Sequence, residues 1–278
     1  MTTGREEARE SSHAAAGGMS LDVARAIQVG LGRLATPLGG RIVLLFLGIR
    51  FVSTVGSQTL VAANRAVMAE LPSRPPIPIG PETTPLALPI SLGPAIGLTL
   101  LVSLLAEAAH IVAIRFVVAE RPAAVGIDRL TRGLPAATIR GFLAGIVAGV
   151  GVLLGLAALV LPGLFLMVSF AFVRQEIAIR DASVIDALAD SWSLTAGNRT
   201  DVLVVLAVVF GVGVLASVPS ILLPELSPIG GSLLIVGLST LSTVFGLAVI
   251  SRAYAQLDAD RAERLAIEDG RAGWSRGP

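Results

Sequence analysis

Long apolar runs recur along the chain and are separated by shorter polar stretches. Because a helix needs about 20 apolar residues to cross the hydrocarbon core of a bilayer, these runs predict membrane spans. Six segments meet or approach this length, namely 42–63, 94–118, 142–161, 164–179, 202–223 and 229–250. The runs are continuous, whereas a membrane barrel needs strands of alternating pattern. The pattern therefore predicts an all-α, polytopic membrane helical bundle with six transmembrane helices.

Two segments outside these runs carry apolar residues at helical spacing. The first is 21–34, and we expect it to lie on the membrane surface as a short interfacial helix. The second is 183–196, whose predicted apolar stripe consists of Ile185, Leu188, Ala189 and Trp192. Since such stripes usually pack against other helices, we expect the second helix to dock under the bundle and to end at Gly197.

The polar ends of the chain complete the predicted domain layout. Residues 1–19 are polar and carry no apolar segment of the kind found in signal peptides, so we expect a disordered N-terminal tail. Residues 20–257 form the predicted six-span membrane domain. Residues 258–278 form a polar C-terminal tail, whose first part has a pattern compatible with a helix.

Prolines mark two of the predicted connections. The segment 71–94 is rich in proline and is predicted to be an extended spacer between spans one and two. Pro162 and Gly163 are predicted to form a tight turn between spans three and four.

Composition agrees with a membrane protein: 54% of the 278 residues are apolar, 15% are charged and the mean hydropathy is +0.81. An ordinary soluble domain has about 25% charged residues, so a water-soluble enzyme is excluded. With no cysteine and two histidines, the chain offers neither a thiolate nor a multi-histidine metal site, and no cofactor is expected. The net charge of +1 gives no basic field for nucleic acid. The expected partners are the lipid bilayer and other membrane or envelope proteins.

The basic residues are distributed unevenly along the chain. All 21 are arginines, and all but Arg50, Arg65 and Arg74 fall on one side of the predicted membrane, including Arg174 at the end of span four. The positive-inside rule then predicts a multi-pass protein of the cytoplasmic membrane with both termini in the cytoplasm. The sequence at Asn198 fits the N-glycosylation pattern, but it lies on the predicted cytoplasmic side and is not expected to be modified.

Four polar residues at predicted membrane depth form the candidate site. Ser103, Glu107 and His110 share one face of span two, and Arg50 lies in span one. At a rise of about 1.5 Å per residue, Arg50 and Glu107 lie at similar depth. Because an unpaired carboxylate in hydrocarbon is protonated or drawn to water, we expect a buried pair between them with His110 nearby. Either these residues line a path for a substrate or protons, or the pair only fixes helix register, which we favour.

Small residues mark predicted helix interfaces. Span three contains Gly141, Gly145, Gly149, Gly151 and Gly155, and span six contains Ser232, Ser239, Ser242, Thr243 and Gly246. Small side chains let membrane helices approach closely, so both sets are predicted to serve packing.

Signatures of enzymes are missing from the chain. There is no phosphate-binding loop, no nucleophile elbow and no zinc-protease helix. Glu107 and His110 have the spacing of one ligand pair of a di-iron bundle, but the second pair that such a site needs is absent. We therefore expect neither a metal nor an enzymatic activity.

Residues 161–199 carry a distinctive pattern, in which a Pro-Gly pair precedes a short span, an acidic residue and a segment of the form ALxxSWxLTxGN. The matching positions are Pro162, Gly163, Glu176, Ala187, Ser191, Trp192, Gly197 and Asn198. The pattern resembles that of uncharacterised multi-span membrane proteins, many of them archaeal, and of the membrane domain attached to some glycerophosphodiester phosphodiesterases. No soluble phosphodiesterase barrel is present, so the resemblance implies a fold and a membrane location but no catalytic residue. We interpret the pattern as a structural junction.

Three functions are compatible with these features. The first is a non-enzymatic scaffold or regulator in the membrane, which the lack of catalytic signatures favours. The second is a transporter of a small solute or lipid that uses Arg50, Glu107 and His110. The third is a membrane enzyme, or an accessory of one, that acts on lipid head groups, as the phosphodiesterase resemblance implies.

Overall fold

The structure is a computed structural model that describes residues 21–70, 84–119, 126–222 and 227–275. The predicted N-terminal tail and most of the proline-rich spacer lie outside the described residues. Within them the chain forms helices and no strand. This confirms the predicted all-α fold class.

Six helical segments are long and apolar enough to cross a membrane, as the sequence predicts. They are α3 (Pro37–Ala69), α4 (Leu92–Val118), α6 (Leu134–Ala158), α7 (Val160–Ser169) together with α8 (Val173–Arg180), α10 (Arg199–Leu222) and α11 (Pro228–Ser275). Helix α11 continues well beyond the predicted span 229–250, so the described part of the C-terminal tail is helical.

Three shorter helices lie outside the spans. Helix α2 (Val23–Leu34) precedes the first span, and α5 (Ile127–Thr131) and α9 (Val184–Thr195) each connect two spans. The Asp22 carboxylate caps α2 by accepting a hydrogen bond of 2.8 Å from the Arg25 N–H. The Ser183 hydroxyl caps α9 in the same way, by accepting from the Asp186 N–H at 3.3 Å. Both helices therefore begin where a side chain satisfies the first free N–H groups.

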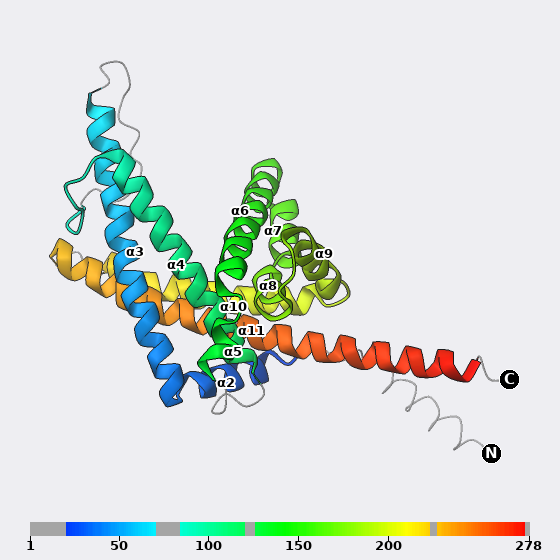
Figure 1. Cartoon of the computed structure of the whole chain (residues 1–278). Coiled ribbons are helices and arrows are strands. Elements are labelled where there is room, and N and C mark those ends of the chain that lie inside the picture. The colour runs from blue at the N-terminus through cyan, green and yellow to red at the C-terminus, as the bar shows by residue number, and fades with distance from the viewer. Residues whose placement is uncertain (1–20, 71–83, 120–125, 223–226, 276–278) are drawn as a thin grey trace.

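Helix α4 is the centre of the bundle, since it contacts α3, α6, α8 and α11. Helices α3 and α4 lie side by side, as do α6 and α7, and α10 and α11 (Figure 1). Figure 1 also shows that α11 crosses α3 and α4 rather than running parallel to them, and that the C-terminal end of α6 lies far from the N-terminal end of α11. The helix pairs thus lie close together around α4 and α8, and their far ends lie apart from one another.

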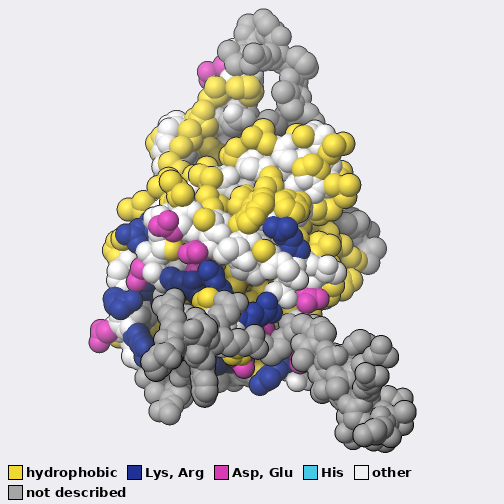
Figure 2. All heavy atoms as spheres, turned by 90° about the vertical axis from the view of Figure 1, so that its right-hand side faces the viewer, with side chains coloured by type: hydrophobic (Ala, Val, Ile, Leu, Met, Phe, Trp, Pro, Cys, Tyr) yellow, Lys and Arg dark blue, Asp and Glu magenta, His cyan; other side chains and the backbone are white. Residues whose placement is uncertain are grey.

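The surface carries a broad apolar region. Large apolar side chains such as Leu153 on α6 and Phe210 on α10 are exposed, at 67% and 73% of their surface. Figure 2 shows apolar side chains over the upper part of one face and arginine and carboxylate side chains gathered below them. Exposed apolar patches of this extent mark contact with lipid or with another protein. Together with the six apolar helices, they define a multi-pass membrane protein.

The fourth span differs from the prediction of one continuous helix. Helix α7 ends at Ser169 and α8 begins at Val173, so a short break interrupts the span at Phe170–Phe172. Across the break the N–H groups of Ala171 and Val173 bond to the Val168 and Phe170 carbonyls, so the regular α-helical bonding is lost there. Broken helices are tolerated in membranes where neighbouring side chains satisfy the freed backbone groups.

The predicted turn at Pro162 and Gly163 is wrong. The chain turns at Leu159, whose extended backbone (φ −163°, ψ 149°) separates α6 from α7, and Pro162 and Gly163 lie in the first turn of α7. Proline fits there because the first helical N–H groups have no partner within the helix. The role of Gly163 is close packing: a Cβ on Gly155 of α6 would lie 2.9 Å from its Cα.

The predicted apolar stripe of α9 is also wrong, because Ile185 is 78% and Trp192 39% exposed. The side of α9 that faces the bundle instead carries Ala187, Ser191, Leu194 and Thr195. Small side chains occupy this face because α9 packs directly against α6, α7 and α8. Apolar spacing alone therefore misplaced the face by about a third of a turn of the helix.

We expect the substitution Gly155→Ala to destabilise the protein by about 1–3 kcal/mol, because its methyl group would overpack the contact with Gly163. Gly149→Ala in the same helix is the matched control, since a Cβ there meets no atom within 4 Å. Thermal unfolding in detergent measures both variants. Equal unfolding temperatures for the two would contradict the close contact between α6 and α7.

Candidate functional site

An ion pair lies inside the bundle between α4 and α8. The Glu107 Oε2 atom of α4 is 3.1 Å from the Arg174 Nη2 atom of α8. The Glu107 side chain is 5% exposed, so its charge is removed from solvent, whereas the Arg174 side chain is 48% exposed. Arg174 neutralises a carboxylate that would otherwise be an isolated charge among apolar helices.

The predicted pair between Arg50 and Glu107 is wrong. The Arg50 Nε–H on α3 donates instead to the Ser239 hydroxyl on α11, at 3.0 Å. Arg174 takes the place of Arg50 and lies in the first turn of α8, directly after the break. Arg174 was expected among the arginines of the cytoplasmic side, because counting residues along a span does not show which neighbouring helix a side chain faces.

His110 lies one turn from Glu107 on α4. Its Nδ1 atom is 2.7 Å from the Ala106 carbonyl, which places a proton on Nδ1 and leaves Nε2 as an acceptor in the neutral ring. The ring stands edge-on to that of Phe46, with centroids 5.0 Å apart. Ser103 donates to the Thr99 carbonyl of its own helix at 2.8 Å. Of the predicted residues on this face, Glu107 and His110 thus belong to the site, and Ser103 bonds elsewhere.

Glycines of α6 make room for the ion pair. A Cβ on Gly141 would lie 2.6 Å from the Glu107 Oε1 atom, and a Cβ on Gly145 would lie 3.7 Å from the Arg174 Nη2 atom. The buried Oε1 atom accepts no hydrogen bond from any described residue. Glu107 is therefore closely surrounded and rests on Arg174 alone for its charge compensation.

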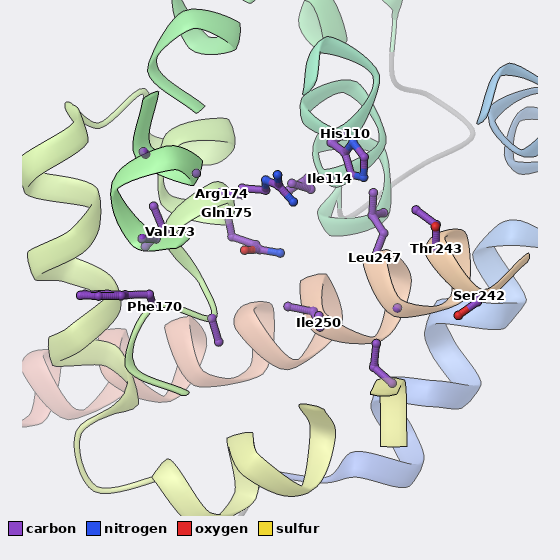
Figure 3. A pocket seen from close by; sticks show the side chains of 16 residues that line it. His110, Ile114, Phe170, Val173, Arg174, Gln175, Ser242, Thr243, Leu247 and Ile250 are labelled. Atoms are coloured by element: carbon purple, nitrogen blue, oxygen red, sulfur yellow. The ribbon is translucent and has the colours of Figure 1, made fainter. Parts of the chain in front are cut away.

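A cavity of about 470 Å³ adjoins the ion pair (Figure 3). Its polar lining is His110 of α4, Arg174 and Gln175 of α8, and Ser242 and Thr243 of α11. In Figure 3, Arg174 extends from α8 toward α4 and lies between the two. The rest of the lining is apolar and includes residues of α6 and α10. A mostly apolar cavity with a few converging polar groups is the usual form of a small-molecule site.

Ser191 of the sequence motif holds the break in the fourth span. Its hydroxyl donates to the Ser169 carbonyl at 2.8 Å and accepts from the Phe172 N–H at 3.1 Å. These are two of the backbone groups that the break leaves without helical partners. Ser191 is fully buried, so the bonds are shielded from water. One side chain of α9 thus fixes the position from which α8 presents Arg174.

Trp192, the next motif residue, belongs to an aromatic cluster beside the break. Its ring meets that of Phe165 edge-on, with centroids 5.2 Å apart. The guanidinium of Arg199 lies over the Phe165 ring, 4.4 Å from the centroid of that ring and 5.3 Å from the centroid of the Trp192 ring.

The last two motif residues, Gly197 and Asn198, lie between α9 and α10. Gly197 has a φ of +89°, a conformation that favours glycine. The Asn198 carbonyl accepts a hydrogen bond of 3.0 Å from the Val202 N–H, the first helical bond of α10.

Helix α8 carries a buried carboxylate of its own, Glu176. It is fully buried, and its Oε2 atom lies 3.4 Å from the Arg180 Nε atom one turn further on. Arg180 also pairs with Asp258 of α11. These contacts join the end of the fourth span to α11 and place Glu176 in a structural network outside the cavity lining.

Several arginines that were not predicted as site residues form ion pairs and hydrogen bonds at the end of the bundle where α4 and α8 end. Arg115 at the end of α4 pairs with Asp181 at 3.2 Å, and Arg132 pairs with the same carboxylate at 3.0 Å. Arg33 of α2 donates to the Val117 carbonyl at 2.6 Å and so caps the end of α4. Burial and the nearby charge of Arg252 lower the pKa of Arg33 from its usual range. In the sequence, these arginines could have been identified by their positions near the ends of helices.

Within the described residues, no group of three His, Cys, Asp or Glu side chains is placed to hold a metal ion. The polar lining of the cavity consists of a guanidinium, an imidazole, an amide and two hydroxyl groups. These groups bind and orient polar ligands through hydrogen bonds and charge.

The fold and its apolar surface define a multi-pass helical membrane protein. More narrowly, the chain belongs to a family defined by a domain of unknown function (DUF7847), whose family model matches residues 21–257. The match covers every helix described here up to the middle of α11, and hence the whole cavity. No curated protein and no solved structure is significantly similar to the chain.

We expect Ser191→Ala to destabilise the protein by about 1–3 kcal/mol, because it leaves the Phe172 N–H and the Ser169 carbonyl buried without their partner. Ser193→Ala is the control, since this exposed hydroxyl only bonds to the Asp190 carbonyl of its own helix. Chemical or thermal unfolding of the detergent-solubilised protein measures the difference. Similar stability of the two variants would show that Ser191 does not hold the break.

Proposed function

We propose that this protein is a membrane transporter that binds an anionic group, carried by a small solute or by a lipid, in the cavity beside Arg174. The observation that carries the proposal is a half-exposed guanidinium facing a cavity within helices long enough to cross a membrane. A guanidinium presents two parallel N–H groups that match the oxygens of a carboxylate or phosphate.

The other polar groups of the cavity suit the same kind of ligand. The His110 Nε2 atom offers an acceptor for a ligand hydroxyl or N–H group. Gln175 and the two hydroxyl residues of α11 lie in the lining as well, and apolar residues supply the remainder. Such a site binds a molecule with one anionic and one less polar part, which describes both organic anions and lipid head groups.

The arrangement of the helices also supports transport. The lining comes from α4, α6, α8, α10 and α11, so a movement of one helix pair against another would change access to the cavity. The break before α8 is a natural position for such a movement. Broken helices beside a polar site near the middle of the bundle are common in secondary transporters.

The proposed location is the cytoplasmic membrane, with both termini in the cytoplasm. The support is the distribution of arginines along the sequence, which follows the positive-inside rule. The ends of the spans at which Arg115, Arg132 and Arg180 form their ion pairs would then face the cytoplasm.

The proposed function predicts that charge at position 174 determines binding. Replacing both members of the ion pair, as Arg174→Gln with Glu107→Gln, avoids an unpaired buried carboxylate and should weaken anion binding roughly 10- to 100-fold. The control is Arg132→Gln, which removes an arginine that is 75% exposed and outside the cavity lining. Calorimetry with methanesulfonate and nanodisc binding of phosphatidylglycerol distinguish a free anion from a lipid head group. Flux of the bound anion across proteoliposomes then tests transport.

If the double variant binds both probes as the wild type does, Arg174 does not form the binding site. If the wild type binds neither probe nor any other organic anion, the proposed function is wrong.

The proposed orientation predicts which residues an impermeant reagent reaches. Since the chain has no cysteine, Ser91→Cys before α4 and Glu263→Cys on α11 each introduce a single thiol at an exposed position. In intact cells, a membrane-impermeant maleimide should label Ser91→Cys and leave Glu263→Cys unlabelled until the cells are opened. The reverse pattern would place the termini outside.

A scaffold function is the second candidate, and the observation that favours it is the length of α11. This helix projects beyond the bundle at its C-terminal end (Figure 1), where Leu265 and Ile267 are 53% and 48% exposed. Exposed apolar side chains on a projecting helix suit the contact with another protein. Removing residues 259–278 would abolish a scaffold function, whereas anion binding in the cavity would persist.

A further inference from the structure

The two members of the Glu107–Arg174 ion pair differ in how they are held. Glu107 is enclosed by α4 and by Gly141 of α6, and its side chain is 5% exposed. Arg174 lies on the other side of the contact, with 48% of its side chain exposed and its guanidinium in the lining of the cavity. A ligand in the cavity therefore reaches Arg174 and not Glu107.

We propose that an anion entering the cavity replaces Glu107 as the partner of Arg174, and that Glu107 takes up a proton as its ion pair opens. This inference rests on the proposed function and adds to it a coupling between anion binding and protons. The exchange is balanced: the Arg174–carboxylate pair, one proton and the anion become an Arg174–anion pair and a neutral carboxylic acid. The site holds one positive and one negative charge before and after the exchange.

The surroundings of Glu107 explain why a proton is needed. Its Oε1 atom has no hydrogen-bond donor among the described residues, and Arg174 is its only ion-pair partner there. A carboxylate that loses its only cation inside a membrane binds a proton, because an isolated charge in hydrocarbon is costly. Gly141 leaves too little space for the carboxylate to turn away toward α6.

The other charged groups around Glu107 do not replace Arg174. From α3, the Arg50 Nε–H donates to the Ser239 hydroxyl of α11. In α6 the only ionisable residue is Arg140, whose guanidinium donates to the Asp181 carbonyl at 2.8 Å. Helix α7 has no ionisable residue, and the part of α11 that precedes Arg252 has none either. On α8, Glu176 and Arg180 pair with each other and with α11. His110 on α4 is the one titratable neighbour that the experiment must separate from Glu107.

The first test measures protons directly in the wild-type protein. Methanesulfonate and phosphatidylglycerol keep their charge between about pH 6 and 8, so any proton taken up on binding belongs to the protein. In weakly buffered solution with a pH-sensitive dye, binding of either probe should consume about one proton per anion. The dissociation constant should fall roughly tenfold for each unit by which the pH is lowered. Binding without proton uptake would overturn the inference and leave the proposed function intact.

The second test identifies the group that takes up the proton. Glu107→Gln removes the competing carboxylate, so the variant should bind the same probes at least as tightly, without proton uptake and without dependence on pH. His110→Gln is the matched control on the same helix. It removes a group of the cavity lining, so its affinity can differ, but each anion that binds should still take up about one proton and show the same dependence on pH. Size-exclusion chromatography and thermal unfolding establish that each variant is folded.

The outcomes separate the two proposals. If the wild type and Glu107→Gln bind neither probe nor any other organic anion, the proposed function fails together with this inference. If Glu107→Gln binds and still takes up a proton, or if His110→Gln loses the uptake, the coupling does not use Glu107. If Glu107→Gln does not fold, the wild-type proton stoichiometry together with the His110→Gln variant decides the question.

Discussion

The cost of a charge in hydrocarbon is the constraint on which the inside of this bundle depends. A carboxylate at the middle of a membrane helix costs about 3 kcal/mol or more on insertion scales, and still more if it stays unpaired. Helix α4 carries such a carboxylate at Glu107, and the bundle supplies its counter-charge from the fourth span. That span is broken at Phe170–Phe172, directly before Arg174, and the Ser191 hydroxyl of α9 bonds to two backbone groups of the break. The buried charge of Glu107 on α4 is thus connected, through Arg174 and the break before α8, to the Ser191 side chain on α9.

Much of the architecture follows from the sequence, because membrane insertion acts on simple properties. Apolar length predicted the six spans, and their number is confirmed in the structure. The position of Glu107 along span two also followed from counting residues, since rise along a helix is fixed. What the sequence did not reveal is the rotation of each helix about its axis. Arg50 and Glu107 have similar predicted depths, yet Arg50 bonds to α11 and Arg174 pairs with Glu107.

The predictions that proved wrong concern turns and helix faces, where packing between helices and not composition determines the local structure. Pro162 and Gly163 have the composition of a turn, but the chain turns at Leu159 and uses Gly163 for contact with α6. Residues 161–199 were interpreted as a structural junction, and nothing in the pattern indicated that Ser191 would bind the Ser169 carbonyl and the Phe172 N–H. Likewise, the buried face of α9 is defined by the small residues that a close approach requires. In each case a local pattern was overruled by a neighbour that is distant in sequence.

The glycines of α6 connect this packing to the chemistry of the cavity. Small residues in membrane helices usually serve backbone approach alone, and Gly155 serves it against Gly163. Gly141 and Gly145 do more, because the space they leave is filled by the Glu107 carboxylate and the Arg174 guanidinium rather than by another backbone. Helix α6 thus forms a smooth wall that holds the carboxylate in place while the guanidinium remains exposed on its cavity side. The same spacing of glycines that sequence analysis assigned to packing therefore also creates the asymmetry of the ion pair.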